Sequence, residues 1–224
     1  MTSFSRTYVF FDLDGTPVDT LAAVRACYSS VFRAHLGRDF PPADVPAGEV
    51  FAMRPTELFA RVAPDRAAEL HDAWCRTYPG CTDQLSVFPQ AARLIAALVD
   101  AGRKPGLVTN KGLERTLTDL AVAGIPPAQF CTIVTAEDTA ERKPHPAPIL
   151  LALERTGAVP GDCVYVGDGP QDILAARAAG LPCVALSYGF YDRADLLPHR
   201  PDALVDDPRG LAATLGLRLP EGTE

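Results

Sequence analysis

Short apolar runs recur along the chain and alternate with segments of helical periodicity. The runs are rich in β-branched and aromatic residues and show no alternation of polar and apolar positions, which is typical of strands buried on both faces. They occupy residues 8–11, 105–109, 131–135, 163–166 and 184–186. Strands of this kind, separated by helices, predict a parallel sheet that is covered by helices on both faces, with right-handed crossovers.

The segments between these runs carry apolar residues three or four positions apart, which predicts helices. One such helix extends from Leu113 to Val122, and Pro89 suits the first turn of the helix before it. A glycine follows the end of each helix, as is common at helix C-termini: Gly102, Gly124, Gly157 and Gly180. The tail, with residues 203–205 and a weak helical pattern over 209–215, is expected to add an edge element.

The interval from about residue 20 to residue 85 has a different pattern, without a convincing strand. Asp19 or Thr20 can cap its first helix, which ends at Gly37. After a proline-rich stretch, the apolar spacing predicts two more helices, over about residues 56–62 and 65–78.

This all-helical interval follows the first strand and precedes the regular strand–helix units, so we expect it to be an insertion. The predicted domains are a sheet-containing core of residues 1–18 and 88–224 and a helical domain of residues 19–87. With 224 residues, the chain is long enough for a core that carries a smaller inserted domain.

Composition and charge narrow the choice of partners. The chain has 47% hydrophobic residues, a net charge of −7 and an isoelectric point near 5.1. This acidic balance argues against a nucleic-acid or anionic membrane surface, but not against a small phosphorylated substrate. The six cysteines lack CxxC spacing, so we expect free thiols in a reducing cytoplasm. No apolar run is long enough to span a membrane, and the first strand comes too early for a signal peptide.

Two acids end the first predicted strand. Asp12 and Asp14 lie two residues apart and are followed by Gly15 and Thr16. Buried strands seldom end in paired acids for packing reasons, because unpaired buried charge is costly. Open α/β sheets bind ligands just beyond the carboxyl ends of their strands, where these acids lie. The alternative is a strand-ending turn with a solvated acid.

Other polar residues follow the later strands. Thr109 and Asn110 can donate hydrogen bonds to an anion, although they can also serve as a helix cap. Lys143 lies in a proline-rich loop that would fix its direction. The chain has only three lysines against eighteen arginines, and two of the three, Lys111 and Lys143, lie beside these strand ends. A surface lysine is the alternative for each.

The strand at residues 163–166 runs into Gly167 and Asp168, with Asp172 four residues further on. If a helix begins there, both carboxylates can face one point. Oxygen ligands without a histidine or cysteine cluster favour a hard cation such as Mg²⁺ over zinc. The alternative is an aspartate N-cap followed by an acid that interacts with the helix dipole.

Together these residues resemble the motifs of the haloacid dehalogenase superfamily of aspartate-nucleophile phosphatases. The matching positions, in order, are Asp12-Leu13-Asp14-Gly15-Thr16, Thr109, Lys143, and Gly167-Asp168 with Asp172. The resemblance extends from about Tyr8 to Ser187. It is nearest to the phosphoglycolate phosphatases and related sugar-phosphate enzymes, whose helical cap is inserted between the first and second motifs. The resemblance implies an α/β fold: a Rossmann-like parallel sheet core with an inserted all-helical cap domain.

The resemblance also implies roles for these residues. Asp12 would be the nucleophile and Asp14 the general acid and base. Mg²⁺ would be held by Asp12, the backbone carbonyl of Asp14 and Asp168, with Asp172 in or near the outer shell. The phosphoryl oxygens would be held by Asn110 and by Thr109 and Lys143, which count as catalytic residues. Substrate binding is also assigned to Thr16 and Lys111. Four carboxylates against +3 from Mg²⁺ and Lys143 leave the site near −1, so the metal would be needed for binding as well as chemistry.

Two positions depart from the family pattern or lie outside its motifs. Pro17 stands where the family usually has an aliphatic residue, in the segment that links core and cap, and would stiffen that hinge. Arg54, in the segment Phe51–Pro55, stands near the place of a specificity loop in related phosphatases. It is assigned to substrate binding, with a solvated arginine as the alternative.

The predicted function is that of a magnesium-dependent phosphatase that hydrolyses a small phosphomonoester, of phosphoglycolate or sugar-phosphate type, through an aspartyl-phosphate. A phosphosugar mutase of the same superfamily would share the core motifs. A haloacid dehalogenase has no need of Asp14, and a phospho-aspartate signalling module lacks both that acid and a helical insertion. We expect a cytoplasmic monomer or homodimer with a small phosphorylated metabolite as its partner, and neither nucleic acid nor membrane.

Overall fold

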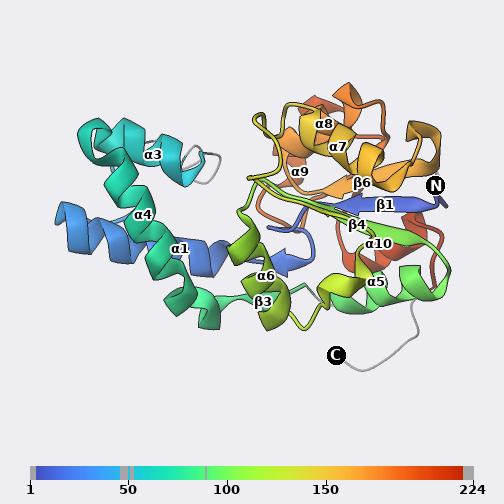
Figure 1. The fold of residues 1–224 in the computed structure, drawn as a ribbon, viewed down its shortest axis with the longest axis horizontal. Coiled ribbons are helices and arrows are strands. Elements are labelled where there is room, and N and C mark those ends of the chain that lie inside the picture. Colours follow the sequence, from blue (N-terminus) through green and yellow to red (C-terminus); the bar gives the residue numbers. More distant parts are fainter. Residues whose placement is uncertain (1–3, 46–49, 51–52, 89, 219–224) are drawn as a thin grey trace. The chain divides into compact units, whose positions relative to one another are not determined.

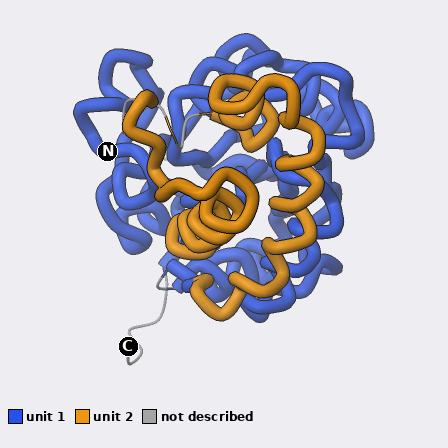
Figure 2. Tube along the Cα trace, turned by 90° about the vertical axis from the view of Figure 1, so that its left-hand side faces the viewer, with its two compact units in different colours: residues 1–19, 86–224 blue, residues 20–85 orange. Residues whose placement is uncertain are grey.

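The computed structural model describes residues 4–45, 50, 53–88 and 90–218, and it divides the chain into two compact units. Unit 1 comprises Met1–Asp19 and Ser86–Glu224, and unit 2 comprises Thr20–Leu85 (Figure 2). Three residues used in the sequence interpretation, Phe51, Ala52 and Pro89, lie outside the described residues.

Unit 1 contains a six-stranded parallel sheet in the order β5-β4-β1-β6-β7-β8. Its strands are β1 (Tyr8–Phe11), β4 (Lys104–Val108), β5 (Ile133–Val134), β6 (Cys163–Gly167), β7 (Cys183–Leu186) and β8 (Ala203–Val205). The prediction of a Rossmann-like parallel sheet is confirmed, and the expected edge element is β8. Only Ile133–Val134 of the run at 131–135 forms ladder contacts, with β4.

Helices cover both faces of this sheet, with α7 and α8 on one side and α5 and α10 on the other (Figure 1). The helices of unit 1 are α5 (Ala91–Asp100), α6 (Leu113–Val122), α7 (Ala147–Thr156), α8 (Pro170–Ala178), α9 (Arg193–Leu196) and α10 (Pro208–Thr214). Helix α6 has the predicted bounds. Helix α9 was not predicted, although Asp192 gives a local signal: its side chain accepts hydrogen bonds from the backbone N–H groups of Ala194 and Asp195.

A second, two-stranded ladder was also missed. Strand β2 (Val18–Asp19) pairs antiparallel with β3 (Ser86–Val87), with Val18 opposite Val87. Each strand has only two residues, which is too short to show any periodicity. The ladder joins the two places at which unit 1 is interrupted by unit 2.

Unit 2 is helical. Its longer helices are α1 (Leu21–Val31), α3 (Pro55–Val62) and α4 (Ala67–Thr77). The helix that begins at Leu21 continues as a π-helical turn, Phe32–Leu36, and ends at Gly37, whose φ is 63°. Thr20 occupies the predicted N-cap position, but its side chain makes no capping hydrogen bond.

The interior of unit 2 is aromatic. The ring of Tyr28 lies 4.8 Å from that of Phe40 in a stacked arrangement, and 5.8 Å from Phe59 and 5.6 Å from Trp74. Contacts of this kind add to the free energy gained from burying the rings. Among the residues that the structure describes, no helix of either unit has both the length and the hydropathy needed to cross a bilayer.

Candidate active site

The carboxyl ends of two central strands bring three carboxylates together. Strands β1 and β6 are neighbours, and the backbone N–H of Asp12 donates to the carbonyl of Val166 at 2.9 Å. Asp168 follows β6, and Asp172 lies in the first turn of α8. One oxygen from each of Asp12, Asp168 and Asp172 lies within 4.8 Å of the others, and all three residues are buried. We call these three residues the acid cluster.

Glycine positions make this close approach possible. Gly15 has a φ of 73°, and a Cβ atom there would lie 2.0 Å from Asp168 Oδ2. A Cβ atom on Gly167 would lie 2.5 Å from Asp172 Cγ. Backbone donors then orient both acids, because Phe190 N–H donates to Asp168 Oδ2 at 2.6 Å and Gly169 N–H to Asp172 Oδ2 at 3.0 Å.

Lys143 supplies a positive charge inside the acid cluster. Its Nζ lies 2.8 Å from Asp12 Oδ1 and donates to Asp172 Oδ1 at 2.7 Å. It also donates to the hydroxyl of Tyr165 at 2.9 Å, and this hydroxyl donates to the carbonyl of Val108 at 2.9 Å. Burial acts to lower the pKa of Lys143, but the charges of Asp12 and Asp172 outweigh it and the pKa is raised. The ammonium is therefore charged and fixed in place.

One ammonium does not balance three buried carboxylates. Burial raises the pKa of Asp12 to about 7; Lys143 opposes this shift, whereas Asp172 and Asp14 add to it. Burial, followed by the charges of Asp172 and Asp12, raises the pKa of Asp168 well above its ordinary value. Within the described residues, the buried Asp12 Oδ1 has the Lys143 ammonium beside it at 2.8 Å and no other hydrogen-bond donor. A divalent cation fits these observations, because it would supply the missing charge to an all-carboxylate donor set.

Asp14 lies outside the acid cluster and has a different partner. Its side chain is 25% exposed, and its Oδ1 accepts a hydrogen bond from Lys111 Nζ at 2.6 Å. Lys111 Nζ also pairs with the carboxylate of Asp119, a fully buried residue of α6. The structure thus places Lys111, which was assigned to substrate binding, between two carboxylates.

The other predicted phosphoryl contacts fall at the same end of the sheet. Thr109 is buried at the end of β4, and its hydroxyl accepts from the Lys111 backbone N–H at 3.1 Å. The carboxamide of Asn110 bonds the backbone of Lys143 in both directions, at 2.9 Å and 3.0 Å. Asn110 therefore holds the loop that presents Lys143. Thr16 is buried, and its hydroxyl has no hydrogen-bond partner in the described part of the chain.

Arg54 belongs to unit 2 and is occupied by a local contact. Its backbone N–H donates to Glu57 Oε2 at 3.0 Å, and its Nε donates to Glu57 Oε1 at 2.7 Å. The first of these bonds caps the N-terminus of α3 through the Glu57 side chain, and the second pairs the two side chains. The Arg54 side chain is 43% exposed, which agrees with the alternative of a solvated arginine. Its role in substrate binding stays a prediction.

Two residues of the site were missed from the sequence. Tyr165 is a polar residue within an otherwise apolar strand, and Asp119 is a charged residue on the face of α6 that also buries Thr116 and Leu120. Both break the apolar pattern of their element. That break is the signal that could have identified them.

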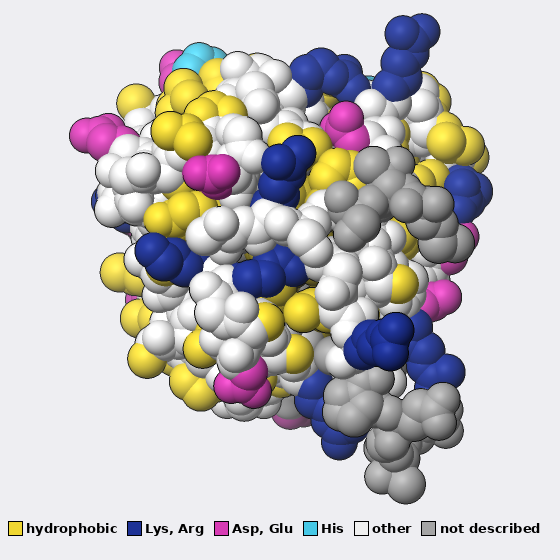
Figure 3. Space-filling model, turned by 90° about the vertical axis from the view of Figure 1, so that its right-hand side faces the viewer, with side chains coloured by type: hydrophobic (Ala, Val, Ile, Leu, Met, Phe, Trp, Pro, Cys, Tyr) yellow, Lys and Arg dark blue, Asp and Glu magenta, His cyan; other side chains and the backbone are white. Residues whose placement is uncertain are grey.

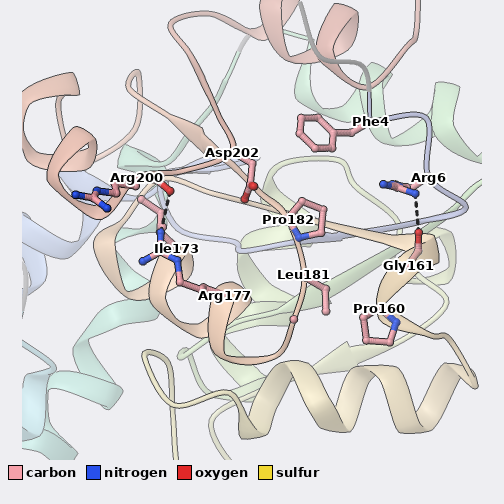
Figure 4. A pocket seen from close by; sticks show the side chains of 11 residues that line it. Phe4, Arg6, Pro160, Gly161, Ile173, Arg177, Leu181, Pro182, Arg200 and Asp202 are labelled. Carbon is pink, nitrogen blue, oxygen red and sulfur yellow. Dashed lines mark hydrogen bonds between the residues drawn. The ribbon is translucent and has the colours of Figure 1, made fainter.

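A separate cavity of about 580 Å³ lies at the amino ends of the strands, opposite the acid cluster, where Gly161 and Pro182 precede β6 and β7. Arg6 lies at one end of it and Arg177 at the other, each donating to a backbone carbonyl (Figure 4). Their guanidinium groups do not converge on one point. Figure 3 views the molecule from the side on which β1 begins in Figure 1, and there Lys and Arg side chains are intermingled with hydrophobic and acidic ones. We assign no chemistry to this cavity.

Comparison with known proteins places the chain in a family. Residues 9–186 match the model of the haloacid dehalogenase-like hydrolases. A phosphoglycolate phosphatase of Xylella fastidiosa is 35% identical over 219 residues, covering 94% of this chain and 93% of that protein. The pyrophosphatase PpaX of Bacillus pumilus is 30% identical over 222 residues, covering 93% of this chain and 95% of that protein.

Solved structures agree in fold. The crystal structure of CbbY from Rhodobacter sphaeroides in complex with phosphate has a TM-score of 0.82 and 28% identity, and covers 95% of this chain and 100% of that one. A mutant of the same protein in complex with xylulose-(1,5)bisphosphate has a TM-score of 0.79 and 27% identity, covering 90% and 94% of the two chains. The chain belongs to the haloacid dehalogenase-like hydrolase family.

Proposed function

We propose that this hydrolase is a magnesium-dependent phosphatase of small phosphomonoesters that works through an aspartyl-phosphate on Asp12. The observation that carries the proposal is the acid cluster with Lys143 inside it: a nucleophile, a fixed cation and an uncompensated negative charge at one point. Burial of this much charge is costly, and such sites are commonly functional.

The proposed reaction has two steps. In the first, a carboxylate oxygen of Asp12 bonds to phosphorus, the bond from phosphorus to the leaving oxygen breaks, and Asp14 gives that oxygen its proton. In the second, a water oxygen bonds to phosphorus while Asp14 takes a proton from the water. The bond from phosphorus to Asp12 breaks, which restores the Asp12 carboxylate and the proton on Asp14 and releases phosphate.

The chain's own residues prepare both steps. Lys143 holds the Asp12 carboxylate and offers positive charge to the phosphoryl oxygens. Further candidates to contact these oxygens are Thr109 and the Thr16 hydroxyl, which has no hydrogen-bond partner among the described residues. Asp12, Asp168 and the backbone carbonyl of Asp14 would hold Mg²⁺, with Asp172 nearby. When bound, the metal would neutralise the acid cluster and the charge that develops on the phosphoryl group.

The substrate class is proposed from the relatives. Phosphoglycolate phosphatases and a protein solved with xylulose-(1,5)bisphosphate favour phosphoglycolate or a sugar phosphate. The names of the phosphatase and pyrophosphatase relatives also favour hydrolysis over a mutase or a signalling module. We further propose that residues 19–87 act as a cap that selects the substrate, with Arg54 as one contact, and that the enzyme is a cytoplasmic monomer or homodimer.

Phosphate release from a panel of phosphomonoesters would test the function. The panel begins with phosphoglycolate and continues with sugar phosphates and nucleoside monophosphates, each with Mg²⁺ and with EDTA. We expect release with Mg²⁺ only, and acid-quenched protein should carry phosphate on Asp12. Asp138→Asn is a matched control, because this acid bonds Arg155 and Thr135 and none of the residues assigned to the site. Release that survives EDTA would refute the metal dependence, and phosphate found on another residue would refute the nucleophile.

A further inference from the structure

We infer that Asp119 is a positioning residue for the reaction, which acts by holding Lys111 against the carboxylate of Asp14. The inference rests on the proposed function, in which Asp14 gives a proton to the leaving oxygen. It adds a buried acid of α6, outside the motifs discussed above, to the apparatus of the site.

The contacts form a continuous chain from the helix interior to Asp14. The Asp119 side chain is fully buried and pairs with Lys111 Nζ, and the Lys111 side chain is itself only 5% exposed. The same Nζ donates to Asp14 Oδ1 at 2.6 Å. Lys111 follows β4, and its backbone N–H bonds the Thr109 hydroxyl, so the lysine is fixed at its base as well as at its tip.

Stability alone gives little reason for this arrangement. A buried ion pair gains little over a well-packed apolar pair of similar volume, because both charges must leave water. The neighbours of Asp119 on the buried face of α6 include Leu120, so an apolar residue would suit this face of the helix. The charged pair therefore does something that an apolar pair would not: it delivers an ammonium to a defined place beside Asp14.

Asp14 needs such a restraint because its side chain is the most exposed of the site's four acids. It is 25% exposed, whereas Asp12, Asp168 and Asp172 are buried. A carboxyl that transfers a proton must stay within hydrogen-bond reach of the leaving oxygen. The Lys111 ammonium, which Asp119 holds through their ion pair, restricts the rotation of the Asp14 carboxyl. Without Asp119, the lysine tip gains freedom and Asp14 loses alignment.

A comparison of leaving groups tests this role. Asp119→Asn keeps the shape of the side chain but removes its charge. General acid catalysis contributes roughly 10²- to 10⁴-fold, so partial misalignment should lower kcat/KM by about 30-fold for an alkyl phosphomonoester such as phosphoglycolate. For p-nitrophenyl phosphate, whose leaving group departs without a proton, the fall should stay below about threefold. A ratio of kcat/KM values is used because it reports the steps up to transfer of the phosphoryl group.

Two reference variants calibrate the result. Asp14→Asn should show the same dependence on the leaving group, with a larger loss. Asp138→Asn should leave the ratio of the two substrates unchanged. If Asp119→Asn does not fold, the doubly substituted Lys111→Met, Asp119→Leu protein removes both charges, and it should also lose activity selectively on the alkyl substrate.

The outcomes separate the two proposals. Equal losses on both substrates would show a general structural defect and overturn the positioning role, while leaving the phosphatase function standing. Full activity of the double variant on phosphoglycolate would also overturn it. A wild-type protein that releases no phosphate from either substrate would overturn the function, and the positioning role with it.

Discussion

The interiors of the two units use opposite chemistry. In unit 2 the described buried residues are apolar and aromatic apart from Thr20, and its ion pairs lie at the surface, such as Arg33 with Asp39 at 73% and 84% exposure. In unit 1 the acid cluster and two lysines, Lys111 and Lys143, are buried beside the carboxyl ends of the strands. Because buried charge costs stability, its concentration at one end of the strands indicates that these residues serve the reaction and not the stability of the fold.

The largest effect expected from this contrast is a loss of activity without a loss of stability. Asp12→Asn should lower kcat by at least about a thousandfold, because the nucleophile is gone. The midpoint of thermal unfolding of the metal-free protein should stay the same or rise, since a neutral amide is easier to bury than a carboxylate. Phosphate release would measure kcat, and calorimetry would measure the unfolding midpoint. If Asp12→Asn kept a tenth of the activity, Asp12 would be excluded as the nucleophile.

The converse is expected for the interior of unit 2. Phe59→Ala removes a fully buried ring that contacts Tyr28 and Phe32, and should lower the free energy of unfolding by about 3–5 kcal/mol. The affinity of the folded protein for Mg²⁺ should not change, because the acid cluster belongs to unit 1. Urea unfolding and titration calorimetry at low temperature would test this. A weaker metal affinity with unchanged stability would contradict the division.

A smaller effect is expected from removing the Tyr165 hydroxyl, which contacts Lys143 beside the acid cluster. Tyr165→Phe keeps the ring but removes the acceptor of a Lys143 hydrogen bond and the donor to the Val108 carbonyl. A hydrogen bond to a charged group contributes about 1.5–3 kcal/mol, so kcat/KM should fall by roughly 10- to 100-fold. Wild-type kinetics in this variant would mean that Asp12 and Asp172 suffice to hold Lys143.

The smallest effect is expected at the surface of unit 2. Arg54→Ala breaks an exposed ion pair with Glu57 and should change the free energy of unfolding by less than about 1 kcal/mol. A rise in KM with kcat unchanged would support a contact of Arg54 with the substrate. Glu57→Ala is the matched control, since it breaks the same pair from the other side. Identical kinetics in both variants would show that the Arg54 side chain serves only as the partner of Glu57.

Local sequence predicts what depends on local pattern. Short, wholly apolar runs identify β1 and β6, and the acids that follow them lie where a parallel sheet binds ligands. Strand order is not a local property, so the adjacency of Asp12 and Asp168 follows from the pairing of these two strands. The partner of Lys111 depends on how α6 is rotated about its axis. Tertiary packing sets that rotation, so the contact of Asp119 with Lys111 could not be predicted from the sequence.

The short β2–β3 ladder has a consequence for protein engineering. Asp19 and Ser86 face each other in it, and paired residues of antiparallel strands lie only about 5 Å apart. A two-residue turn such as Asn-Gly spans that gap in hairpins. Sixty-six residues could thus be excised between these positions and replaced by a turn, without moving either strand. Such a minimal protein would retain the acid cluster, and the same junction would accept foreign domains.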